Sequence, residues 1–182
     1  YITLEMAEER IAERIDANLL DVTMEDLHDM PKQLYEGKIT KLREKTQGQL
    51  VIKEYPTASA HSGHFKSLMN ELALKKSFRP DVIFIDYLNI CASSRFKGGN
   101  ISSYFYVKAI AEELRGLAVE FNVPIFSATQ TTRTGYVSTD IGLEDTSESF
   151  GLPATADFMF ALISNEELEA LGQMKVKQLK NR

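Results

Sequence analysis

The chain has 182 residues, of which 43% are hydrophobic and 26% charged, a composition that is typical of globular proteins and excludes disordered and fibrous classes. Its net charge of −5 means that any nucleic-acid site would have to consist of local basic loops, because the chain as a whole carries no positive field. One cysteine excludes an internal disulfide, three scattered histidines make no zinc-type cluster, and the lack of a long apolar run or signal peptide predicts a cytoplasmic protein without a membrane segment.

The first predicted elements alternate between strand and helix. Residues 1–4 have the pattern of a short strand, with the carboxylate of Glu5 at its carboxyl end. Residues 6–20 repeat apolar side chains at helical spacing and predict an amphipathic helix. Thr23, which acidic residues follow, predicts a helix N-cap, and the proline at the start of residues 31–45 fits the first turn of another helix.

A strand and a helix are predicted next, at residues 50–55 and 65–78, with a polar loop between them. His61 and His64 lie in that loop. Two histidines at this spacing can ligate a metal, but no third ligand is suitably spaced, so we predict that they are solvated loop residues. The order strand, helix, strand, helix predicts a parallel α/β sheet, and we expect one domain over residues 1–182.

The strongest strand signal is the apolar run at residues 81–88, which we predict to be buried on both faces, as in a parallel sheet. Asp86 lies near the end of this run. Because an unpaired buried charge costs several kcal/mol, we expect Asp86 at the open carboxyl edge of the sheet, where α/β folds bind ligands. The run alone leaves a second interpretation open, in which this carboxylate only caps the following turn.

A basic loop follows at residues 93–100. It combines Arg95 and Lys97 with Phe96 and two glycines. Cations that hold phosphates, together with an aromatic ring that stacks on a base, are a common means of binding single-stranded nucleic acid. The loop alone favours an ordinary solvated turn, and only its position after Asp86 favours a binding function.

The second half of the chain continues with a long helix at residues 104–122 and a strand at residues 124–129 that leads to Gln130. An amide at a strand end can both donate and accept a hydrogen bond, which suits a sensor of phosphate or water. The polar stretch at residues 131–145, which contains Arg133, is too long for a simple connection and is typical of functional or disordered loops. The last predicted elements are a strand at residues 158–164, a short helix at residues 166–171 and a strand at residues 174–179.

Several segments, in this order, resemble the RecA-like motor domain of hexameric replicative DNA helicases of the DnaB type. The matching segments are residues 3–6 (second motif), 85–88 (Walker B strand), 127–130 (glutamine motif) and 148–157 (fourth motif). The helices around residues 14–18 and 107–115 look most like those of family members from T-even bacteriophages. The resemblance covers nearly the whole chain and implies an α/β, RecA-like P-loop NTPase fold with three layers and a mostly parallel sheet.

This resemblance also implies roles for individual residues. It makes Glu5 the base that polarises the attacking water, Asp86 the ligand that holds Mg²⁺ through water, and Gln130 the sensor of the ATP γ-phosphate. Lys180 and Arg182 match the family's Lys-x-Arg pair, which reaches into the ATP site of the adjacent subunit. A guanidinium supplied in this way stabilises the charge that develops in the transition state. ATP and Mg²⁺ are the implied cofactors.

The resemblance and the basic loops together imply DNA contacts from Arg95, Lys97, Arg133 and Glu148. One position departs from the family pattern: bacterial members carry an arginine before the acid of the fourth motif, where this chain has Ser147. The implied partners are single-stranded DNA, further copies of the chain in a hexamer, a primase and a helicase loader, in the cytoplasm of a bacterial host cell.

The family's phosphate-binding loop, Gly-x-x-x-x-Gly-Lys followed by Ser or Thr, does not occur in the sequence. In the family this loop precedes the strand with which the chain begins, so the resemblance implies a fragment that lacks the strand and loop of Walker A and is inactive alone. Two other functions stay open: a RecA-type recombinase or clock-type ATPase of the same fold, and a non-catalytic α/β binding module. The joint presence of Glu5, Asp86 and Gln130 argues against the module.

Overall fold

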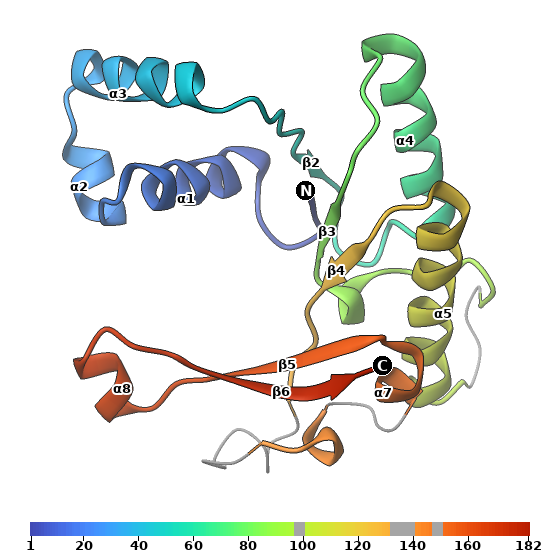
Figure 1. Ribbon diagram of the computed structural model, residues 1–182. Helices are drawn as coiled ribbons and strands as arrows, with labels where there is room; N and C mark the ends of the chain where they lie inside the picture. Colours follow the sequence, from blue (N-terminus) through green and yellow to red (C-terminus); the bar gives the residue numbers. More distant parts are fainter. Residues whose placement is uncertain (97–100, 132–140, 147–150) are drawn as a thin grey trace.

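The computed structural model describes residues 1–96, 101–131, 141–146 and 151–182, and its elements surround a parallel sheet (Figure 1). The strands of this sheet lie in the order β2-β1-β3-β4 and all pair in parallel. Their bounds are Ile2–Thr3 (β1), Lys53–Glu54 (β2), Ile83–Asp86 (β3) and Ile125–Ser127 (β4). A second sheet pairs β5 (Phe158–Ile163) with β6 (Lys175–Asn181) in antiparallel fashion. The predicted α/β class with a mostly parallel sheet is confirmed.

The helices begin close to the predicted positions, and side chains cap three of them. The helices are α1 (Glu8–Leu20), α2 (Met24–Asp29), α3 (Lys32–Lys45), α4 (Ser62–Lys76), α5 (Ser103–Phe121), α7 (Gly151–Thr155) and α8 (Glu166–Ala170). Those with side-chain caps are α2, α4 and α8. Thr23 caps α2 as predicted, because its Oγ1 accepts a hydrogen bond from the Asp26 amide at 3.0 Å.

The two neighbouring histidines have a structural function that the sequence analysis did not assign. Nδ1 of His61 accepts a hydrogen bond from the Gly63 amide at 3.0 Å, and Nδ1 of His64 accepts one from the His61 amide at 3.2 Å. His64 is exposed, as predicted for a solvated residue, but it lies in the first turn of α4 and His61 is the N-cap, so the prediction that both lie in a loop without a structural function is wrong. Because the imidazoles supply the acceptors that a helix start requires, α4 begins at Ser62 rather than at residue 65.

The main core lies between the central sheet and two helices, α4 and α5, which Figure 1 shows on the same side of the sheet. Its buried side chains include Phe65 and Met69 of α4, Ile83 and Ile85 of β3, and Val107, Ile110, Leu114 and Leu117 of α5. Side chains alternate between the two faces of a strand, so only Ile83 and Ile85 of β3 point into this core.

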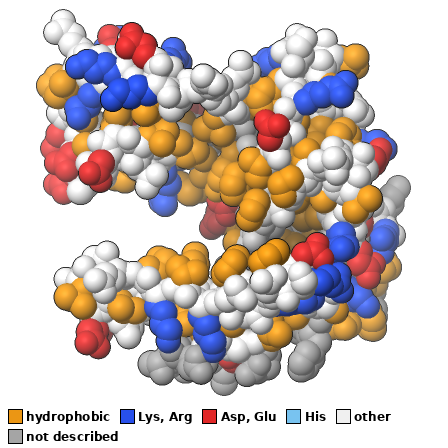
Figure 2. Space-filling model, in the orientation of Figure 1, with side chains coloured by type: hydrophobic (Ala, Val, Ile, Leu, Met, Phe, Trp, Pro, Cys, Tyr) orange, Lys and Arg blue, Asp and Glu red, His pale blue; other side chains and the backbone are white. Residues whose placement is uncertain are grey.

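The opposite face of the sheet is open. Phe84 is 42% exposed and Phe126 53% exposed, so the prediction that the third strand is buried on both faces is wrong. The rings of Tyr1 and Phe84 stack at 6.2 Å, and those of Phe84 and Phe126 at 5.2 Å, which forms an aromatic row across three strands. Helices α1 to α3 extend away from the sheet (Figure 1). Figure 2 shows hydrophobic side chains gathered in the recess between these helices and the β5–β6 hairpin.

A smaller cluster lies under the β5–β6 hairpin, where Ala161, Ile163 and Ile141 are buried and Leu179 packs against them. The short helix α7 packs against α5, and Lys180 of β6 donates a hydrogen bond to its Pro153 carbonyl. At Gly151 an added Cβ would lie 3.2 Å from Cβ of Lys108, so a larger residue there would press on the Lys108 side chain of α5. Among the described residues, no helix is long and apolar enough to span a membrane.

Candidate functional site

Three predicted site residues lie at or just after the carboxyl ends of neighbouring strands: Asp86 is the last residue of β3, and Glu5 and Gln130 follow β1 and β4. Thr3 of β1 pairs with Asp86 of β3, and the amide of Leu4 donates to the Asp86 carbonyl at 2.9 Å. Glu5 therefore follows β1 at the level where β3 ends. On the other side of β3, β4 leads to Gln130. The structure thus places all three at the carboxyl edge of one parallel sheet, where α/β folds bind ligands.

Buried Thr3 shapes the turn that presents Glu5. Its Oγ1 donates a hydrogen bond to the Met6 carbonyl at 2.8 Å and accepts one from the Met6 amide at 3.0 Å. Thr3 is 0% exposed, whereas Glu5 is exposed. The backbone on both sides of Glu5 is therefore fixed while its carboxylate stays open to solvent.

Asp86 is partly buried and has one strong donor. The phenol of Tyr1 donates to its Oδ2 at 2.8 Å, and burial together with this bond raises the pKa of the Tyr1 phenol to about 12. Ser127 of β4 donates its hydroxyl to the Ile85 carbonyl at 2.8 Å, which ties the end of β3 to β4. The carboxylate is thus held in one orientation at the sheet edge.

The carboxylate of Asp86 could hold Mg²⁺ whose other ligands are water and phosphate, since that ion commonly uses one or two protein carboxylates. The described part of the chain contains no group of three or more His, Cys, Asp or Glu residues that could hold a metal ion.

Gln130 contacts the residue that follows Asp86. Its Nε2 donates to the Tyr87 hydroxyl at 3.1 Å, and the amide of Leu88 donates to the Ala128 carbonyl at 3.2 Å. A side-chain bond and a backbone bond therefore link the segment after β3 to the segment after β4.

Lys180 and Arg182 lie elsewhere, at the α7 end of the β5–β6 hairpin (Figure 1). Nζ of Lys180 donates to the Pro153 carbonyl at 2.6 Å, and Arg182 forms an ion pair with Asp157 at 3.3 Å. Arg115 pairs with the same carboxylate at 2.8 Å and, with Arg182, holds the pKa of Asp157 below its usual value. The structure does not bring Lys180 or Arg182 to the strand-end residues of their own chain.

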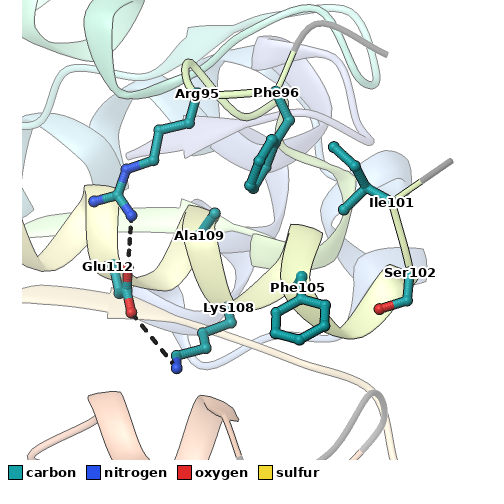
Figure 3. Close-up of a pocket in the computed structure, with 8 residues that line it drawn as sticks. All are labelled: Arg95, Phe96, Ile101, Ser102, Phe105, Lys108, Ala109 and Glu112. Carbon is teal, nitrogen blue, oxygen red and sulfur yellow. Dashed lines mark hydrogen bonds and ion pairs between the residues drawn. The ribbon is translucent and has the colours of Figure 1, made fainter. Parts of the chain in front are cut away.

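The start of the basic loop lies against α5. Arg95 pairs with Glu112 at 2.6 Å, and Lys108 lies 3.9 Å from the same carboxylate. A cavity of about 610 Å³ opens there, with Phe96 and Phe105 among its lining residues. Figure 3 shows Arg95 and Phe96 reaching from the loop toward the helix. The other predicted DNA contacts, at Lys97, Arg133 and Glu148, lie outside the described residues.

One residue that the sequence analysis missed is Glu113, which is 9% exposed on the core side of α5. A signal for it exists in the sequence, because it falls three positions after Ile110 and four before Leu117 on the apolar stripe. A carboxylate on such a stripe needs hydrogen-bond donors, which here come from the basic loop and from α4.

Comparison with known proteins gives consistent matches. The family model described as "DnaB-like helicase C terminal domain" matches residues 1–180. The chain is 51% identical over 185 aligned residues to the DnaB-like replicative helicase of Enterobacteria phage T4, with 100% of this chain and 39% of that protein covered. It is 34% identical over 138 residues to a probable plasmid replicative DNA helicase of Chlamydia trachomatis, with 73% of this chain and 28% of that protein covered. The chain therefore spans less than half the length of these relatives.

Solved structures agree on the fold. The chain superposes on a DnaB-like replicative helicase, whose structure was described with its interactions with primase, at a TM-score of 0.76 and 19% identity, covering 100% of this chain and 44% of that one. A solved ATPase domain gives a TM-score of 0.77 at 18% identity, covering 100% of this chain and 66% of that one. At these identities the superpositions establish the RecA-like architecture.

Proposed function

Because the chain belongs to the family of DnaB-like helicase C-terminal domains, we propose that it is the motor part of an ATP-dependent replicative DNA helicase. In this proposal a ring of such subunits moves along single-stranded DNA and unwinds the duplex ahead of it. The observation that carries the proposal is the position of Glu5, Asp86 and Gln130 at the carboxyl ends of three adjacent strands. That edge is where a nucleotide would meet both an acid and a polar sensor.

Each of these residues has a role that fits its surroundings. Glu5, exposed after a fixed turn, orients and deprotonates the attacking water. Asp86 would hold Mg²⁺ through water, and the ion would supply positive charge beside the phosphate oxygens. Gln130 senses the γ-phosphate and passes its position to Tyr87 through their 3.1 Å hydrogen bond.

Lys180 and Arg182 act in a neighbouring subunit in this proposal. Their location away from their own chain's strand-end residues supports that role, because a residue needed at its own site would have to lie near it. In the described structure Arg182 pairs with Asp157, so it would exchange that carboxylate for a phosphate when the ring assembles.

DNA is contacted by the loops that follow β3 and β4. Arg95 is exposed and follows β3 closely, which supports this assignment. Lys97 and Arg133 are assigned to the same surface because in the sequence they belong to the segments that follow two strands of one sheet, and Glu148 because it belongs to the segment that resembles the fourth motif. Phosphate contacts of this kind make affinity fall with rising salt.

The partners follow from the same proposal: single-stranded DNA, further copies of the chain in a hexamer, a primase and a helicase loader, in the cytoplasm of a bacterial host. One structural relative was solved with attention to its interactions with primase, which supports a primase as partner. The rival functions are a recombinase or clock-type ATPase of the same fold, and a binding module without chemistry.

The test uses the complete protein that carries this chain, a labelled forked duplex, and ATP with Mg²⁺. A helicase separates the fork and hydrolyses ATP faster when single-stranded DNA is added. Exchange of homologous strands without separation of the fork would support the recombinase instead. Absence of ATP turnover in the assembled ring would support the binding module.

A further inference from the structure

A carboxylate on the core side of α5 has no role in the chemistry proposed above. Oε1 of Glu113 accepts a hydrogen bond from the Ser93 hydroxyl at 2.7 Å, and Oε2 accepts one from the Ser62 hydroxyl at 2.9 Å. Ser62 is the first residue of α4, and Ser93 belongs to the segment after β3. One carboxylate thus joins α5 to two segments that are far apart in the sequence.

Backbone amides of the basic loop complete the shell of donors. The Ser94 amide lies 3.0 Å from Oε2 of Glu113, and the Arg95 amide lies 3.4 Å from Oε1. The Ser93 amide donates to the hydroxyl of Tyr106, also on α5, at 3.1 Å. Burial alone would raise the pKa of the Glu113 carboxyl, but these donors hold it below its usual value, so the group stays charged at neutral pH.

Arg95 is the last residue of the basic loop that donates a hydrogen bond to the Glu113 carboxylate among the described residues. The guanidinium of that residue reaches back to α5 and pairs with Glu112, the neighbour of Glu113. Two consecutive acids of one helix therefore hold the same loop, one through its backbone and the other through its cation. Since the oxygens of Glu113 already accept several hydrogen bonds, this carboxylate is suited to holding the loop rather than to moving a proton.

We propose that Glu113 is a positioning residue for single-stranded DNA. It fixes the backbone at Ser94 and Arg95 and so sets the position from which the Arg95 side chain can reach a DNA phosphate. Glu112 holds the guanidinium until a phosphate replaces it. The inference rests on the proposed function, because it requires that Arg95 contacts DNA.

The test measures binding of a labelled oligothymidine to the complete helicase over a range of salt concentrations. The logarithm of the affinity falls linearly with the logarithm of the salt concentration. Replacing Arg95 by alanine should make this negative slope shallower by about 0.7, the value for one phosphate contact on a single strand. Glu113→Ala should make the slope shallower by a similar amount and weaken DNA binding about tenfold at moderate salt. Its KM for ATP, measured without DNA, should stay unchanged. Adding Glu113→Ala to Arg95→Ala should change binding little further.

Two further variants separate positioning from general stability. Glu113→Gln keeps an acceptor of the same length and should restore part of the affinity that Glu113→Ala loses. Glu120→Ala removes an exposed carboxylate of the same helix that pairs with Lys66, and should leave binding unchanged. If Glu113→Ala does not fold, Glu113→Gln and Ser93→Ala carry the test, with hydrogen exchange of the Ser94 and Arg95 amides as the structural readout. Faster exchange at these amides is the expected result.

The outcomes distinguish the inference from its premise. If Arg95→Ala weakens binding while the Glu113 variants bind with unchanged affinity and slope, the positioning role is wrong and the DNA assignment stands. Fully additive effects of Arg95→Ala and Glu113→Ala would also overturn it, because a residue that acts through Arg95 has nothing left to act on. If Arg95→Ala itself leaves the slope unchanged, the DNA contact in the proposed function is wrong and the inference falls with it.

Discussion

The phenol of Tyr1 donates a 2.8 Å hydrogen bond to Oδ2 of Asp86, across 85 positions of the sequence. The contact follows from the parallel pairing of β1 with β3, which sets Thr3 beside Asp86. The ring of Tyr1 also stacks on Phe84, at 6.2 Å, on the open face of the sheet. Asp86 is thereby oriented by a side chain from the strand that leads to Glu5.

The first prediction concerns Tyr1→Phe and alkaline pH. The Tyr1 phenol has its pKa raised from 10.0 to about 12, so the folded protein keeps a proton that the unfolded chain releases. This contribution to stability is present below about pH 10 and is lost as the pH rises toward about 12. Urea unfolding should therefore show a larger loss of stability between about pH 9 and pH 11 for the unchanged chain than for the variant. Equal losses would show that this phenol does not titrate as described. The other tyrosines are present in both proteins and cancel in the comparison.

A second prediction concerns the bond between Gln130 and Tyr87. In the complete helicase, Gln130→Ala should keep its affinity for ATP but lose most of the stimulation of turnover by single-stranded DNA, because the sensor no longer reaches the segment after Asp86. Tyr87→Phe removes only the hydroxyl and should lose a smaller part of the stimulation. ATP turnover with and without oligothymidine gives both values. Full stimulation in Gln130→Ala would mean that coupling runs through other residues.

Strand and helix positions were predictable where the side chains of one element alone decide them. Thr23 and Asp26 form their cap within four residues, so local sequence is sufficient to predict it. The burial of β3 was not predictable in this way, because an apolar run cannot show which of its faces another element covers. Phe84 has the residue type of a core position and lies on the open face.

The site shows the same division. The placement of Glu5, Asp86 and Gln130 after strands was visible in the sequence, and parallel pairing then brings them to one edge. The partners of Glu113 were not visible, because Ser62 and Ser93 lie 51 and 20 positions away. The pairing of Arg182 with Asp157 depends in the same way on how β6 returns beside the start of β5.

A third prediction concerns Arg182 and its proposed action across subunits. Mixed rings of Arg182→Ala and Glu5→Gln subunits should contain some interfaces that carry neither defect, and should recover ATP turnover that each variant ring lacks. Lys175→Ala, an exposed change on the same strand, serves as the matched control and should keep full activity. Turnover that never exceeds that of the variant rings would argue that Arg182 acts within its own subunit.

A fourth prediction concerns nucleotide binding by the 182-residue chain itself. Its sequence has no Gly-x-x-x-x-Gly-Lys loop, and positioning the triphosphate is most of what phosphoryl transfer requires. Calorimetry with ATP and Mg²⁺ should therefore detect no binding in the micromolar range. A micromolar dissociation constant would mean that the phosphates bind at a place other than the one proposed.

The most direct test of the account is ATP turnover by the complete helicase carrying Glu5→Gln, compared with Glu9→Gln. Both changes replace an exposed acid by its amide, but Glu5 follows β1 at the strand-end site and Glu9 lies in the first turn of α1. The account predicts that Glu5→Gln lowers DNA-stimulated turnover about a hundredfold or more while ATP still binds, and that Glu9→Gln has no effect. Turnover of Glu5→Gln within about twofold of the unchanged protein would contradict a general base at this position.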